Sequence, residues 1–72
     1  MNDTVRVWRV RKNHTWIDAR LHERTQTRDV ELQFFYDGTL VLARQCATRD
    51  AALATAGTYL ENLLRAGWNT HW

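Results

Sequence analysis

The dipeptide Asp37-Gly38 lies between two runs of strand-forming residues and constrains the fold more than any other feature of the sequence. Both central residues of a two-residue type I′ hairpin turn need a positive φ, which Asp and Gly adopt readily. We therefore predict a hairpin with strands over 29–36 and 39–46. Opposite residues in such a hairpin share a face. The expected pairs are Tyr36–Thr39, Phe35–Leu40, Phe34–Val41, Gln33–Leu42, Leu32–Ala43 and Glu31–Arg44.

An alanine- and leucine-rich segment after this hairpin predicts a helix over 49–66. Thr48 is suited to cap its first turn, where Asp50 also complements the helix dipole, and Gly67 is suited to end it. The apolar residues at helical spacing, which we expect to face the sheet, are Leu53, Ala56, Leu60, Leu63 and Leu64. One helix covers only one face of a sheet, so we expect the other face, here called the open face, to stay uncovered.

Two further strands are predicted over 4–11 and 14–24, from their β-branched and aromatic residues and their alternation. Together these elements predict an α+β fold, a four-stranded antiparallel β-meander with one C-terminal helix packed on one face. Residues 1–72 then form a single compact domain, in which 67–72 are a short tail.

The register of the first hairpin has two solutions. A three-residue loop at 11–13 would pair Trp8 with Trp16 on the open face. A two-residue loop at 12–13 would instead place Trp8 beside Ile17 in the core and Arg9 beside Trp16. The two solutions differ sharply, because a one-residue slip turns every side chain to the other face. We favour the first because it groups the apolar side chains Val5, Val7, Ile17, Ala19 and Leu21.

The open face would combine large apolar side chains with arginines. The residues expected to bind there are Arg6, Trp8, Trp16, Arg20, Phe35, Leu40, Leu42 and Arg44. An apolar centre rimmed by Arg is typical of protein interfaces, so we predict contact with a protein partner or a second copy in a homodimer. Two alternatives remain. Nucleic acid could bind the same face through Arg on phosphates and rings on bases, or Trp68 or Trp72 could fold back and cap it.

Charge is unevenly distributed along the chain, although the net value is only +2. Residues 1–28 carry seven basic and three acidic side chains, whereas 29–72 carry three basic and five acidic ones. Nine of the ten basic residues are Arg, whose planar guanidinium suits contact with carboxylates, phosphates and rings. Because nucleic-acid-binding domains usually concentrate more positive charge, we rank nucleic acid below a protein partner.

No motif in the sequence predicts catalysis. His14, His22 and His71 lie far apart without metal-ligand spacing, and Cys46 has no second cysteine to pair with. Gly-rich phosphate loops and nucleophile elbows are also missing from the sequence. We therefore expect no enzyme, no metal, no cofactor and no small-molecule substrate.

Size and composition bound the remaining possibilities. The chain has 72 residues, 44% of them hydrophobic and 25% charged, which is typical of a small folded domain. No apolar run approaches the ~20 residues that span a bilayer, and the polar start predicts no signal peptide. With one free thiol, these features favour a cytoplasmic bacterial or phage protein without membrane contact. The order of strands and helix resembles sheet-plus-helix DNA-binding modules of plant transcription factors and integrase arm domains. It is equally similar to many small bacterial and phage proteins, so we assign no family.

Overall fold

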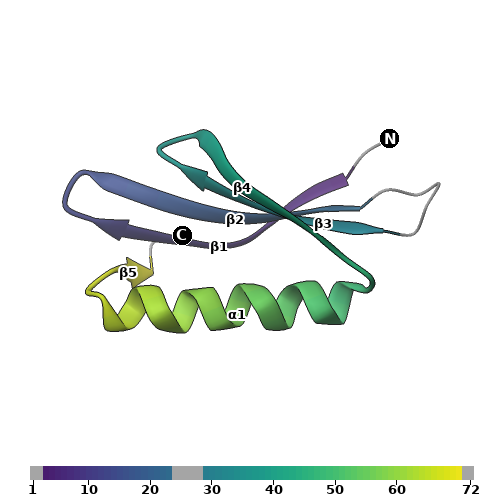
Figure 1. Ribbon diagram of the computed structural model, residues 1–72. Helices are drawn as coiled ribbons and strands as arrows, with labels where there is room; N and C mark the ends of the chain where they lie inside the picture. Colours follow the sequence, from purple (N-terminus) through teal and green to yellow (C-terminus); the bar gives the residue numbers. More distant parts are fainter. Residues whose placement is uncertain (1–2, 24–28, 71–72) are drawn as a thin grey trace.

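The computed structural model describes residues 3–23 and 29–70. Its elements are β1 (Asp3–Lys12), β2 (Thr15–Glu23), β3 (Val30–Tyr36), β4 (Thr39–Cys46), α1 (Arg49–Arg65) and β5 (Asn69–Thr70). Neighbouring strands are antiparallel, in the spatial order β4-β3-β2-β1-β5 (Figure 1). The predicted α+β fold, a four-stranded meander with a C-terminal helix on the sheet, is confirmed. The element bounds lie within one residue of the ranges above, residue 24 falls outside the described residues, and β5 was not predicted.

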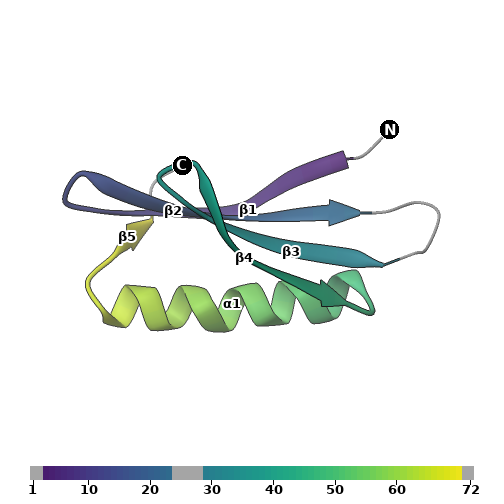
Figure 2. The same ribbon diagram turned by 45° about the horizontal axis from the view of Figure 1, so that its top comes forward.

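Helix α1 lies along one face of the sheet, and no described element covers the opposite face (Figures 1 and 2). The hydrophobic core lies between the sheet and α1. Its buried side chains are Trp8, Val10, Ala19, Leu21, Val30, Leu32, Phe34, Ala52 and Ala56. The open face expected from the single helix is therefore present.

Both ends of α1 are capped as the sequence predicts. The Thr48 hydroxyl accepts a hydrogen bond from the Ala51 amide at 3.1 Å. At the other end Gly67 has a φ of 99°, and its amide donates to the Leu64 carbonyl at 3.2 Å. The Trp68 amide donates to the Leu63 carbonyl at 3.0 Å, which completes a Schellman motif. Residues within a few positions of each end, through one side-chain cap and one glycine, thus mark where this helix begins and ends.

Replacing the N-cap, Thr48→Ala, should lower the free energy of unfolding by roughly 1 kcal/mol, because an orphan backbone amide loses its acceptor. Thr58→Ala is the matched control. The Thr58 hydroxyl donates to the Ala54 carbonyl inside the helix. That carbonyl also accepts the backbone hydrogen bond of the helix, so it keeps a partner when the hydroxyl is removed. Alanine has the higher helix propensity, so this variant should be neutral or more stable by up to about 0.5 kcal/mol. Urea unfolding measures both, and equal losses would contradict the capping role.

The helix face turned toward the sheet is only partly the predicted one, because Ala56, Leu60 and Leu63 do pack against the core but Leu53 and Leu64 do not. Ala52 and Ala56 are fully buried, whereas Leu53 and Leu64 are 41% and 44% exposed. The reason is steric. The Trp8 indole lies under the helix and donates a hydrogen bond from Nε1 to the Ala56 carbonyl at 2.9 Å. A large ring so close to the helix backbone requires small side chains at the contact, so α1 turns Ala52 and Ala56 toward the sheet.

The first hairpin has neither of the two registers considered above. Its turn is Asn13-His14, where Asn13 takes a φ of 59°, and Lys12 pairs with Thr15. A bulge between Arg6 and Trp8 then adds one residue to β1. In the register set by the turn, Trp8 pairs with Ala19 on the helix side and is only 2% exposed. The favoured placement of Trp8 on the open face is therefore wrong, because the turn at Asn13-His14 lies further along the chain than predicted and shifts the register.

The second hairpin starts as predicted and then departs from the expected pairing. Asp37 and Gly38 have φ values of 50° and 84°, as a type I′ turn requires, and Phe35 pairs with Leu40. A bulge follows on β4, so Leu42 pairs with Phe34 and not with Gln33. The pairs beyond it, from Gln33–Ala43 to Val30–Cys46, are shifted in the same way. Leu42 and Arg44 therefore lie on the helix side, and their predicted place on the open face is wrong.

The C-terminal tail does fold back, but against the core and the sheet edge. Asn69 and Thr70 form β5 and pair with Arg11 and Val10 of β1. Trp68 packs against the buried core cluster between the sheet and α1, so it does not cap the open face. Trp72, the other residue considered for that role, lies outside the described residues.

Candidate binding surface

A buried carboxylate lies at the centre of the open face. Asp18 is 4% exposed, and three guanidinium groups approach it from neighbouring positions on β1 and β2. The distances are 3.9 Å from Arg6 Nε to Oδ2, 3.0 Å from Arg9 Nε to Oδ1 and 3.1 Å from Arg20 Nη2 to Oδ2. A buried charge is tolerated only when it is closely paired, and these three cations provide that pairing.

The three contacts with Asp18 are not equivalent. Arg20 makes a hydrogen bond to the carboxylate, through Nη2 and Oδ2. The Arg9 Nε and Asp18 Oδ1 atoms are both buried, and neither makes a hydrogen bond within the described part of the chain. Their 3.0 Å contact is therefore electrostatic and lacks hydrogen-bond alignment. Arg6, at 3.9 Å and with 44% of its side chain exposed, is held most loosely.

Two aromatic rings of the open face carry guanidinium groups. The guanidinium carbon of Arg9 lies 4.3 Å from the ring centroid of Trp16, and that of Arg11 lies 5.8 Å from the same ring. Arg20 lies 4.6 Å from the ring centroid of Phe35. All three distances are within the range of cation–π attraction. The rings thus act as platforms that hold arginine side chains in fixed positions.

We call Arg6, Arg9, Arg11 and Arg20 the arginine cluster. Three of its cations surround one anion, Asp18, and the fourth, Arg11, lies near the Trp16 ring, so this part of the open face is strongly positive. Toward the other end of the face the pairing brings His22 beside Glu31, and the Gln33 amide donates to the Glu31 carboxylate at 2.6 Å. Positive charge is therefore concentrated around Asp18 and Trp16.

The structure brings five of the eight predicted binding residues together on the open face: Arg6, Trp16, Arg20, Phe35 and Leu40. Trp8 belongs to the core, and Leu42 and Arg44 lie on the helix side. Sequence reasoning missed Arg9 and Arg11 as binding residues. The unfavoured two-residue loop would have found Arg9, since it placed that residue beside Trp16. The observed surface is thus more basic and less apolar than the predicted one.

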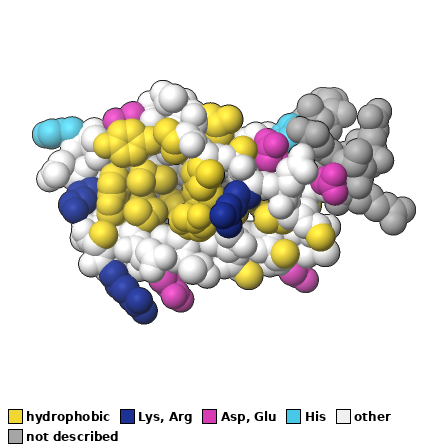
Figure 3. Space-filling view, in the orientation of Figure 1, with side chains coloured by type: hydrophobic (Ala, Val, Ile, Leu, Met, Phe, Trp, Pro, Cys, Tyr) yellow, Lys and Arg dark blue, Asp and Glu magenta, His cyan; other side chains and the backbone are white. Residues whose placement is uncertain are grey.

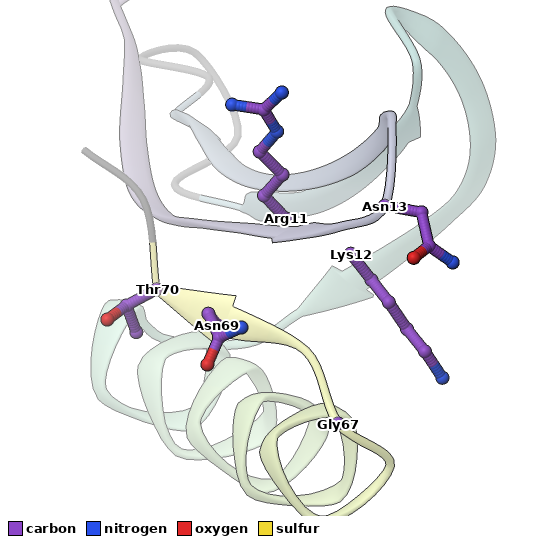
Figure 4. Close-up of a pocket in the computed structure, with 6 residues that line it drawn as sticks. All are labelled: Arg11, Lys12, Asn13, Gly67, Asn69 and Thr70. Carbon is purple, nitrogen blue, oxygen red and sulfur yellow. The ribbon is translucent and has the colours of Figure 1, made fainter.

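A shallow hollow of about 370 Å³ lies at the opposite end of the domain from the β4–α1 connection. It is lined by Arg11, Lys12, Asn13, Gly67, Asn69 and Thr70. Figure 4 shows that their side chains point in different directions and do not converge on a common point. Lys12 Nζ donates to the Ala66 carbonyl at 2.9 Å and so caps the end of α1. The hollow lacks the converging polar groups of a catalytic or small-molecule site.

Across residues 3–23 and 29–70, no three His, Cys, Asp or Glu side chains are grouped as a metal ion would need. Cys46 is a free thiol at the end of β4. None of the described helices combines the length and apolar character needed to cross a membrane. Comparison with protein-family models, curated proteins and solved structures finds no significant match to this chain.

Proposed function

We propose that this chain is a non-enzymatic interaction module whose open face binds an acidic segment of a partner protein. The observation that carries the proposal is the arginine cluster, in which three guanidinium groups surround a single buried carboxylate and a fourth lies near the adjacent Trp16 ring. Guanidinium groups bind carboxylates through paired, charge-assisted hydrogen bonds. Asp18 and the rings of Trp16 and Phe35 already hold these side chains, so binding would cost little additional conformational entropy.

A second copy of the chain is a poor occupant of this face. Two arginine clusters would then meet across the interface, and like charges placed opposite each other oppose association. Leu40 and Phe35 offer apolar contact there, but Arg20 covers the Phe35 ring. An acidic partner neutralises the cluster instead. The single free thiol, Cys46, suits a reducing compartment, so we place this interaction in the cytoplasm.

Nucleic acid is the second candidate, favoured by the same cluster of arginines beside Trp16. Phosphates would meet the guanidinium groups as carboxylates do. Two features weigh against it. The chain has a net charge of only +2, and Arg9 and Arg11 occupy positions near the Trp16 ring where a base would stack.

Fluorescence anisotropy tests the proposal with two labelled probes of matched charge, an oligoglutamate peptide and an oligothymidylate. Arg11→Glu removes a cation that does not contact Asp18 within 4 Å, so the fold should survive. We expect it to weaken binding of the peptide by about tenfold or more, the equivalent of one paired contact. Arg65→Glu, at an exposed position on α1, makes the same charge change away from the open face. It should change the affinity less than about twofold, since distant exposed charges are screened.

The outcomes separate the two candidates. Equal losses in both variants would mean that binding follows net charge alone, and would contradict a site on the open face. Tighter binding of the oligothymidylate, abolished by Arg11→Glu, would replace the protein partner with nucleic acid. Binding of neither probe at low salt would overturn both candidates.

A further inference from the structure

Strand β4 is an open edge of the sheet. The opposite edge, β1, is covered in part by β5, which pairs with Val10 and Arg11. In the described part of the chain β4 pairs only with β3, so its outer backbone groups face no strand. Every residue of β4 except Cys46 is exposed. Backbone amides and carbonyls arranged in this way form a template for another strand.

This edge is also apolar on both faces of the sheet. Leu40, on the open face, is 49% exposed, Val41 at the bulge is 60% exposed, and Leu42 on the helix side is 39% exposed. Tyr36, on the same side as Leu42, is 42% exposed. Figure 3 shows hydrophobic side chains gathered on this side of the molecule, between the sheet and the C-terminal half of α1. Apolar surface that continues around a strand edge is typical of an interface.

We propose that β4 pairs antiparallel with β4 of a second copy of this chain, so that one sheet runs through both protomers. The required partner is a strand with an unpaired edge and apolar side chains on both faces, and β4 itself meets both conditions. A two-fold axis near Val41 and Leu42 would bring the apolar residues 40–43 of the two chains together.

Charge along β4 supports self-pairing. Arg44 is the strand's single charged residue and lies near its C-terminal end. With the axis between Val41 and Leu42, the two Arg44 positions lie five residues apart along the paired strands. At ~3.3 Å per residue this separation is roughly 17 Å, about twice the Debye length at physiological salt. Repulsion between the two Arg44 side chains is therefore weak, unlike the repulsion between two arginine clusters.

The helix side contributes to the same interface. An axis perpendicular to the sheet places both helices on one side and brings the exposed Tyr36 and Leu42 of one copy toward those of the other. The arginine cluster lies on the opposite face and on β1 and β2, so it stays accessible in the dimer. A domain of 72 residues buries a small core, and association is a common way to add buried area.

Light scattering after size exclusion tests this inference on the full chain. We expect a mass near twice the 8.5 kDa of one chain, falling toward the monomer on dilution. Val41→Lys and Ala43→Lys each place a cation beside the axis and should give monomers, with circular dichroism confirming the fold. Leu53→Lys is the matched control, because Leu53 is an exposed apolar residue of α1, 41% accessible. That variant should remain a dimer.

A wild-type protein that stays monomeric at the highest concentration reached would overturn the inference. So would a dimer that survives both Val41→Lys and Ala43→Lys, since the interface would then lie elsewhere. If Arg11→Glu dissociates the dimer and the two lysine variants do not, the copies are joined through the open face, and the inference is wrong. Binding of the oligoglutamate probe is measured in a separate experiment. The oligomeric state therefore does not decide whether the proposed function is right.

Discussion

Trp8→Ala should lower the free energy of unfolding by roughly 3–5 kcal/mol, the usual cost of truncating a buried aromatic residue. The indole is 2% exposed, lies 6.0 Å from the Phe34 ring between centroids, and donates a hydrogen bond to the Ala56 carbonyl. A chain of this length has a total stability of about 4–11 kcal/mol. We therefore expect a large unfolded fraction at room temperature, measured by near-ultraviolet circular dichroism and urea unfolding.

Trp16→Ala is the matched control for that change, because it truncates the same residue type on the open face. It should remove only the contacts with Arg9 and Arg11, at a cost of about 1 kcal/mol or less. A cost for Trp16→Ala equal to that for Trp8→Ala would contradict the register of the first hairpin. If Trp16→Ala cost more stability than Trp8→Ala, Trp8 would lie on the open face, as the favoured register of the first hairpin predicts.

Asp18→Asn should have the next largest effect, a loss of roughly 1–3 kcal/mol in the free energy of unfolding. The substitution keeps the shape of the side chain but removes the anion that holds three cations together. Because those arginines are partly exposed, we expect less than the full cost of breaking a buried ion pair. Part of the loss should return at high salt, which screens repulsion among the remaining cations.

Glu61→Gln controls for the loss of a negative charge, since Glu61 is exposed on α1. It should change stability by less than about 0.5 kcal/mol. Urea unfolding at low and high salt measures both variants. A loss for Asp18→Asn that is the same at both salt concentrations would argue that packing, and not charge, holds the arginine cluster.

Local signals in the sequence predicted the elements and their ends. The Asp37-Gly38 turn, the Thr48 cap and the Gly67 stop each depend on residues within a few positions, and the structure contains all three. Helix orientation was not predictable in the same way. Ala52 and Leu53 are neighbours, and the selection of Ala52 for the core depends on the distant Trp8 ring.

The position of the first turn and two bulges explain why only part of the binding surface was predicted. One extra residue near Val7 and another near Val41 reverse the faces of the residues beyond them. The first keeps Arg6 on the open face although Trp8, two residues later, lies in the core, and the second moves Leu42 and Arg44 to the helix side. No short-range signal in the sequence marks either bulge. The predicted surface was consequently too apolar, and its arginine cluster was only half identified.

Titration of the isotope-labelled protein with the oligoglutamate peptide, followed by nuclear magnetic resonance, tests the central proposal most directly. We expect the largest shift changes at the backbone amides of Arg9, Arg11 and Arg20 and at the indole of Trp16. The indole of Trp8, buried under α1, should serve as an internal reference and change little. Shift changes confined to α1 or to β4, or none at saturating peptide, would contradict binding at the open face.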